Sequence, residues 1–224
     1  MPRDERKHQK ALMKKRSKQK AVASHRSQQQ DFASLSGQTI IRRSRAFPVF
    51  ECWISDNWDK DDLGLVEILL SRQQPDGDIC FGTYLIDKYC LGLKSTFANA
   101  GFSLSRYQND VLGRVFHRTK PVECPLELAH QMIYGAIDYA GQFGFEPDKD
   151  FALSQHLLLP RGELAEPYHL TFGRNGKPFF IAGPYDNAER IINRLEKTAG
   201  RGNYDFVSPL GDFDAFDDDD DFEM

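Results

Sequence analysis

The sequence contains little of what disulfide-rich and membrane-spanning proteins are built from. Only 4 of its 224 residues are cysteine, and no C-x-x-C pair occurs. A chain of this length with so few cysteines does not fit a disulfide scaffold, so we expect reduced, mostly buried thiols and a cytoplasmic location. No apolar run approaches the length of a membrane span. The basic N-terminus has no apolar segment behind it, so a secretory signal is not expected.

The motifs of common enzyme classes are also missing. The sequence has no G-x-x-x-x-G-K-[ST] phosphate loop, no G-x-S-x-G elbow and no H-E-x-x-H zinc motif. Structural zinc sites use Cys and His pairs two to four residues apart, whereas Cys124 and His130 are six apart. We therefore expect no metal and no cofactor, and the sequence favours a protein that is not an enzyme.

Acidic residues are scarce at one end of the chain, and basic residues are absent from the other. Residues 1–46 hold 13 Lys and Arg residues against 3 Asp and Glu, whereas residues 205–224 hold 9 acidic residues and no basic one. Blocks of like charge repel themselves and stay solvated. We therefore divide the chain into a basic arm and linker (1–46), one folded domain (47–204) and an acidic tail (205–224), with the arm and the tail disordered.

The folded domain carries the patterns of paired strands. Residues 46–55 (AFPVFECWIS) alternate and are aromatic, which predicts a strand. Residues 64–87 read as two β-rich runs around Pro75–Asp76–Gly77, a hairpin signature. The second run continues through residues 88–94 (KYCLGLK), so we expect a long strand or one that bends at Gly92. A second hairpin is predicted around Asn175–Gly176, the best two-residue turn signal in the chain.

Four helices are predicted between and after these strands. Residues 103–118 form a helix capped by Ser103 or Ser105, and residues 124–145 carry the strongest helical stripe. Residues 148–159 form a short helix, and the last helix starts at Asp186, which resembles the first residue of a capping box. Because helices do not alternate with single strands, we expect an α+β fold: a mainly antiparallel sheet with helices packed on one face.

Two stretches of the sequence resemble known proteins. The segments "FECWISDNW" and "ELAHQMIYGAIDYAGQFGFEPDKDF" belong to a core that resembles a group of uncharacterised bacterial proteins, which implies one bacterial cytosolic domain and no particular activity. The tail "DFDAFDDDDDFEM" is similar to the acidic, aromatic C-terminal tips of bacterial single-stranded DNA-binding proteins. Those tips recruit partner proteins and compete with nucleic acid for basic surfaces. The resemblance implies a partner-binding or competing role for Phe213, Phe216 and Phe222.

The basic arm carries the clearest functional signal. Its cations would cover most of the circumference of a helix, and basic arms that fold on RNA are a recognised binding mode. We therefore predict a non-enzymatic, RNA-associated protein, with the ribosome as a candidate partner and no membrane partner. The predicted nucleic-acid-binding residues are Arg6, Lys7, Lys10, Lys14, Lys15, Arg16, Lys18 and Lys20, followed by Arg42, Arg43 and Arg45 where the arm meets the core.

An alternative function is a metal-dependent phosphodiesterase or another hydrolase around Asp87 and His130. Asp87 interrupts an apolar strand, which is where metal-dependent nucleases place a first ligand. Glu127 and His130 lie on one flank of the strongest helix, so the carboxylate could orient the imidazole. The structural interpretations are that Asp87 pairs with Lys88 or Lys94 and that His130 only bonds neighbouring groups. A metal would need further carboxylates from among Glu51, Glu67, Asp138, Asp148 and Asp150.

A third class is a protein-interaction adaptor that recruits partners through the Phe and Asp residues of the tail. The tail also has a candidate partner within the chain, because its net charge of −9 opposes the +10 of residues 1–46. In that interpretation the tail occupies the arm and is displaced by a polyanion such as RNA.

Overall fold

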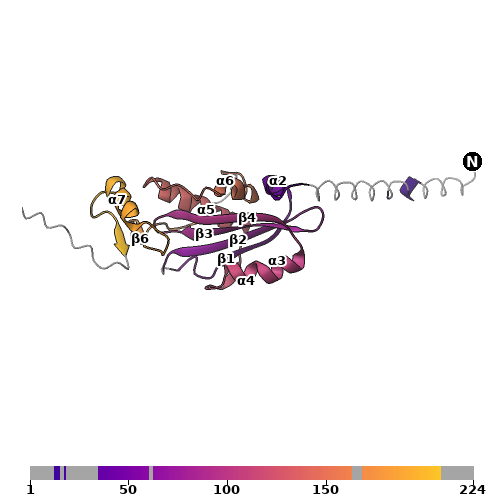
Figure 1. Cartoon of the computed structure of the whole chain (residues 1–224), viewed down its shortest axis with the longest axis horizontal. Coiled ribbons are helices and arrows are strands. Elements are labelled where there is room, and N and C mark those ends of the chain that lie inside the picture. Colours follow the sequence, from indigo (N-terminus) through magenta and orange to yellow (C-terminus); the bar gives the residue numbers. More distant parts are fainter. Residues whose placement is uncertain (1–12, 16–17, 19–34, 61–62, 163–167, 208–224) are drawn as a thin grey trace, which may run out of the picture.

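A five-stranded antiparallel sheet lies at the centre of the molecule, with strand order β4-β3-β2-β1-β5 (Figure 1). The computed structural model describes residues 13–15, 18, 35–60, 63–162 and 168–207. The strands are β1 (Val49–Ser55), β2 (Leu65–Gln73), β3 (Ile79–Asp87), β4 (Gly92–Phe102) and β5 (Pro121–Glu123). β1 to β4 form a meander in which each strand pairs with the next, and β5 returns to pair with β1. The predicted α+β class and its antiparallel sheet are confirmed.

One face of the sheet packs against the strongest predicted helix and three shorter elements (Figure 1). These are α5 (Leu126–Gly141), α2 (Gly37–Arg43), α6 (Phe151–Ser154) and the 3-10 turn Gln155–Leu157. Alternation along β2 directs Val66, Ile68 and Leu70 into this core, because successive strand side chains point to opposite faces. The stripe predicted on residues 124–145 supplies the other side of the core, including Met132 and Ile133.

The opposite face of the sheet is also covered, which corrects the prediction that helices pack on one face only. α3 (Leu104–Asp110) and α4 (Leu112–Val115) pack there against Leu69 and Phe81, and Ser103 caps α3 as predicted. The buried Tyr107 hydroxyl donates to Ser71 Oγ at 3.0 Å. The physical reason is that β2 is apolar at consecutive positions, so both of its faces need cover.

The expected long strand over residues 79–94 is instead two strands joined by a tight turn. β3 ends at Asp87, and β4 begins at Gly92, whose φ is +69°. A Cβ atom at Gly92 would lie 2.8 Å from the carbonyl oxygen of Ala136 on α5, so a side chain does not fit there. The turn therefore packs closely on α5, and β4 completes the meander.

A small unit follows at one end of the sheet (Figure 1). It contains β6 (Phe179–Ile181), α7 (Ala188–Thr198) and β7 (Asp205–Val207), and β6 pairs with β7 in parallel. Asn175 and Gly176 do form a turn with positive φ, but among the described residues only one bridge, Arg174 to Lys177, flanks it. The predicted turn is therefore present, but the paired strands predicted on either side of it are not, so the prediction of a second hairpin is wrong.

The cap of α7 also differs from the prediction. Asn187, not Asp186, is the N-cap, and its side chain accepts a hydrogen bond from the amide of Arg190 at 3.0 Å. Asp186 is engaged elsewhere, because its Oδ2 accepts from the amide of Gly183 at 2.9 Å. The helix does end before Gly200, whose φ is +86°.

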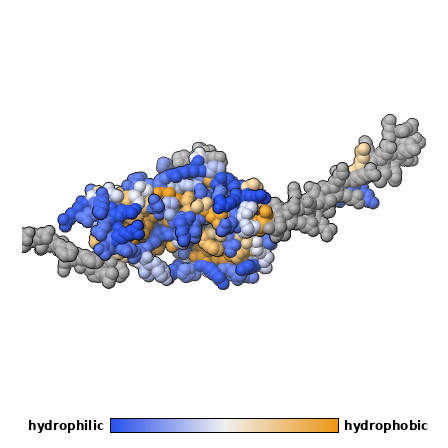
Figure 2. Space-filling view, turned by 45° about the horizontal axis from the view of Figure 1, so that its top comes forward, coloured by the Kyte–Doolittle hydropathy of each residue, from blue (hydrophilic) through white to orange (hydrophobic). Residues whose placement is uncertain are grey.

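The folded domain extends past both predicted boundaries. Ile40 and Ile41 of α2 are buried in the main core, so the domain starts near residue 35 rather than residue 47. Asp205–Val207 form β7, so it ends no earlier than residue 207. Ile40 and Ile41, which lie among the cations of residues 37–45, anchor α2 to the main core. All four cysteines are free and buried, as predicted, and hydrophilic residues cover most of the visible surface (Figure 2).

Candidate functional site

The described part of the basic arm is helical and exposed. Met13, Lys14, Lys15 and Lys18 all have helical backbone and exposed side chains. Lys14 and Lys18 share a helix face because they are four residues apart, and Lys15 points about 100° away from Lys14. The other predicted arm residues, Arg6, Lys7, Lys10, Arg16 and Lys20, lie outside the described residues, as do Phe213, Phe216 and Phe222 of the tail.

The arginines at the junction between arm and core divide into two kinds. Arg42 and Arg43 are exposed in the last turn of α2. Arg45 is tied to the core, because its Nε donates to the carbonyl of Leu158 at 2.8 Å and its guanidinium also reaches the carbonyl of Gln155 at 3.1 Å. Arg42 and Arg43 therefore remain candidates for phosphate contacts, whereas Arg45 has a structural role.

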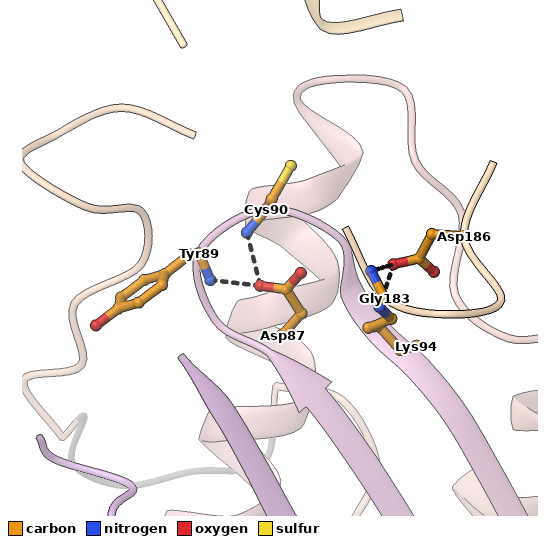
Figure 3. A network of polar contacts seen from close by, with 6 residues as sticks. All are labelled: Asp87, Tyr89, Cys90, Lys94, Gly183 and Asp186. Carbon is orange, nitrogen blue, oxygen red and sulfur yellow. Dashed lines mark hydrogen bonds and ion pairs between the residues drawn. The ribbon is translucent and has the colours of Figure 1, made fainter. Parts of the chain in front are cut away.

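Asp87 holds the turn between β3 and β4 (Figure 3). Its side chain is 5% exposed, and its Oδ1 accepts from the amides of Tyr89 and Cys90, both at 3.0 Å. Burial raises the pKa of Asp87 to about 6, and the two amide bonds oppose that rise. A carboxylate used in this way is a turn-forming group, because one oxygen already receives two backbone donors.

Lys94 pairs with Asp186 rather than with Asp87 (Figure 3). The distance from Lys94 Nζ to Asp186 Oδ2 is 2.7 Å, and both side chains are less than one-fifth exposed. Lys88 Nζ donates to the carbonyl oxygen of Lys60 at 2.5 Å. The pair between Lys94 and Asp186 therefore fastens the segment before α7 to β4, and the ion pair proposed for Asp87 is replaced by the amide bonds of its turn.

His130 is buried in the core, 2% exposed, while Glu127 is exposed. The imidazole centre lies 4.6 Å from the ring centre of Tyr134. Burial, with a smaller contribution from Arg45, lowers the pKa of His130, so the ring is neutral at pH 7. Its Nδ1 has no hydrogen-bond partner among the described residues.

The structure does not bring Asp87 and His130 to one site. His130 lines an open groove of about 590 Å³ together with Tyr134, Asp138 and Arg161, and Asp87 is not part of that lining. Among the described residues, no group of three or more His, Cys, Asp and Glu side chains is placed to hold a metal ion. The described part of the chain therefore does not assemble the hydrolase site that the sequence suggested as an alternative.

Sequence analysis missed a groove beside α7. About 570 Å³ lies between α7, residues 145–148 and the start of β4, and a second hollow of about 550 Å³ adjoins it along the helix. Arg190 and Arg194 line both. The signal was present in the sequence: Arg190, Arg194, Lys197 and Arg201 follow a spacing of four, three and four, which places cations on one side of a helix.

The described helices include none with the length and apolar character needed to cross a bilayer. Comparisons of the chain with models of known protein families, with curated proteins and with solved structures find no match.

Proposed function

We propose that this chain is a non-enzymatic, cytoplasmic RNA-binding protein whose basic arm contacts the phosphate backbone, with the ribosome as its candidate partner. The observation that carries the proposal is the cationic, exposed helical segment at Lys14, Lys15 and Lys18, within an arm that has 13 basic residues against 3 acidic ones. These cations point to more than one side, so the arm can contact phosphates on several strands or helices of a folded RNA.

The junction of the arm with the core supports the same proposal. Arg42 and Arg43 add exposed cations on α2, which is anchored by buried isoleucines. The nearby His156 has its pKa lowered by burial and, after that, by Arg45 and Arg42. A local positive field of this kind attracts phosphate. The rest of the domain is acidic, with a net charge of −5 over residues 47–204, so the contact is confined to the arm and its base.

The direct test is RNA binding by the full chain and by the variant Lys14→Glu/Lys15→Glu/Lys18→Glu. Each phosphate contact contributes about 0.7–0.9 to the slope of log K against log salt, so the variant should lower that slope by about 2 to 3. The control reverses three exposed cations on another surface, Arg114, Arg118 and Lys120. Binding by the control should change much less. Equal losses in both variants would refute an arm-specific contact.

Two further measurements separate the proposal from its alternatives. Sedimentation with ribosomes at low salt, lost at high salt, would support a ribosomal target, whereas a defined co-purifying protein would support the adaptor. Turnover of RNA with Mg²⁺ or Mn²⁺, abolished by Asp87→Ala or His130→Ala in a protein that still folds, would establish the hydrolase in place of the RNA-binding protein.

A further inference from the structure

The chain leaves its last strand at the lip of the groove beside α7. The carbonyl of Val207, the last residue of β7, accepts from the amide of Ala182 at 3.0 Å. Gly183 follows Ala182, and its amide donates to Asp186 Oδ2 at 2.9 Å. Asp186 lines the groove. The chain that follows Val207 therefore starts beside Ala182, four residues before Asp186 in the wall of the groove.

Apolar groups are exposed at this exit. Tyr185 is 99% exposed at the mouth of the groove, and Phe206 and Val207 on β7 are 40% and 53% exposed. Inside the groove, Leu91 and Ile191 provide further apolar surface. Exposed aromatic and aliphatic side chains that gather at a hollow are typical of a surface that another segment covers.

The wall formed by α7 is cationic. Among the described residues, Arg190 and Lys197 on α7 and Arg201, three residues beyond its end, form no ion pair, while Arg194 donates to the carbonyl of Gly144. The groove also contains three carboxylates, of which Asp186 is paired with Lys94; the other two are Glu146 and Asp148. α7 also carries Glu189 and Glu196, but its three cations outnumber them, so the excess charge along the helix is positive. A ligand with an apolar anchor and several carboxylates fits the groove and the helix together.

The acidic tail of this chain has that composition and starts at this place. Residues 211–224 hold eight carboxylates and three phenylalanines, and Phe213 is six residues beyond Val207. Six extended residues span at most about 20 Å, so Phe213 can reach a groove that begins next to Val207. The base of the arm at α2 lies at the other end of the domain (Figure 1). The tail therefore meets the α7 groove before it meets the arm.

We propose that residues 211–224 fold back onto the groove beside α7, with Phe213 against its apolar lining and the aspartates that follow along Arg190, Lys197 and Arg201. Because the tail is tethered at the lip, its effective concentration at the groove is in the millimolar range, about 1 mM or more, so modest contacts suffice. The inference goes beyond the proposed function and does not depend on RNA binding.

Zero-length carbodiimide cross-linking of the full chain tests this directly, since it joins a carboxylate to an amine in contact. The expected product links the tail to Lys197, read by mass spectrometry after proteolysis. An equal mixture of ¹⁴N and ¹⁵N protein identifies links within one molecule. Because exposed charges are screened within about 3 Å at 1 M salt, the Lys197 link should fall severalfold when salt is raised to about that level.

Two variants separate anchoring from charge alone. Phe213→Ala keeps every carboxylate, and it should lower the yield of the Lys197 link by about threefold or more if the ring is anchored. Arg190→Glu/Arg201→Glu removes cations on either side of Lys197 and should lower the yield by about fivefold. The matched control, Arg114→Glu/Arg118→Glu, changes charge equally on another surface and should leave the yield unchanged.

Three cross-linking results would contradict docking of the tail in the groove beside α7. Tail links to the arm lysines 14, 15 and 18 with none to Lys197 would place the tail on the arm instead. Links to Lys197 only between ¹⁴N and ¹⁵N molecules would indicate a second copy as the tail's source. A Lys197 yield unchanged by both Phe213→Ala and Arg190→Glu/Arg201→Glu would show random collision rather than docking.

Discussion

The Sγ atoms of Cys52 and Cys124 lie 3.6 Å apart in the main core, where the amide of Cys124 also donates to the carbonyl of Cys52 at 3.0 Å. The hydrogen bond with Cys124 and burial both raise the pKa of Cys52 far above the ordinary range of a thiol. The thiolate is the reactive form of cysteine, so Cys52 is held in its inert form.

We predict that Cys52 of the folded protein resists alkylation. At pH 8 and low denaturant, iodoacetamide should label Cys52 at least about a hundredfold more slowly than in concentrated urea, because reaction requires the core to open. Mass spectrometry of the labelled peptides measures this. An exposed reactive cysteine would instead be labelled at a similar rate in both conditions, and such a result would contradict the buried pair.

The pH dependence of stability should report the turn at Asp87. Its pKa is about 6 in the folded protein and about 3.8 when unfolded, so between these values the folded state binds more protons. The contribution of Asp87 to the free energy of unfolding is therefore greatest below pH 4 and is lost as pH rises through 6. As pH rises across this window, the free energy of unfolding of the wild type should fall by about 2–3 kcal/mol, and that of Asp87→Asn should not.

Urea unfolding at pH 4, 5, 6 and 7 checks this prediction. The matched control is Asp59→Asn, an exposed carboxylate whose removal should leave the pH profile of the wild type in place. If Asp87→Asn and the wild type run parallel across the window, the buried carboxylate does not titrate as the geometry implies.

The pair between Lys94 and Asp186 should hold the β6–β7–α7 unit against the main sheet. Removing one member leaves a largely buried charge without its partner, so Asp186→Ala should lower the free energy of unfolding by about 1–3 kcal/mol. Hydrogen exchange should rise most in α7 and β6. The exposed pair between Asp138 and Arg161 supplies the control, since Asp138→Ala should cost less than about 1 kcal/mol.

Elements of this fold that depend on local interactions are predictable from the sequence, whereas those that depend on long-range contacts are not. The alternation in β1, the β-rich runs of β2 and β3 around their turn signal, and the apolar stripe of α5 are local signals, and they predict what the structure contains. The second helical layer was missed because an apolar run such as that of β2 shows that both faces are buried, but not what covers them. The turn at Gly92 was read as a long or bent strand because the positive φ of Gly92 and its close approach to Ala136 and Ala140 are properties of the folded chain.

The candidate site divides in the same way. Charge is a property of the sequence, so the cationic arm and the acidic tail were evident without a structure. The two carboxylates at Asp87 and Asp186 were misassigned because their partners come from elsewhere in the fold: backbone amides for the first, and Lys94 from β4 for the second. The groove beside α7 required the packing of that helix on residues 145–148, which lie far away along the chain.

Deleting residues 1–30 should remove RNA binding and leave the domain folded. The first residues with buried side chains in the described chain are Ile40 and Ile41, and the cap of α2 at Ser36 lies beyond the deletion. The variant should therefore unfold cooperatively within about 1 kcal/mol of the full chain, since surface changes away from packed groups are small. Filter binding at low salt and urea unfolding measure the two properties.

The contrasting variant places the change a few residues later. Ile41→Ala keeps the arm and its charge but removes a side chain that is 1% exposed in the main core. It should lower the free energy of unfolding by about 2–4 kcal/mol, because Ile→Ala changes in cores lose both transfer energy and packing. At a temperature where it is still folded, its RNA affinity should match that of the full chain. If the deletion keeps its affinity and Ile41→Ala loses it, the RNA contact belongs to the domain rather than to the arm.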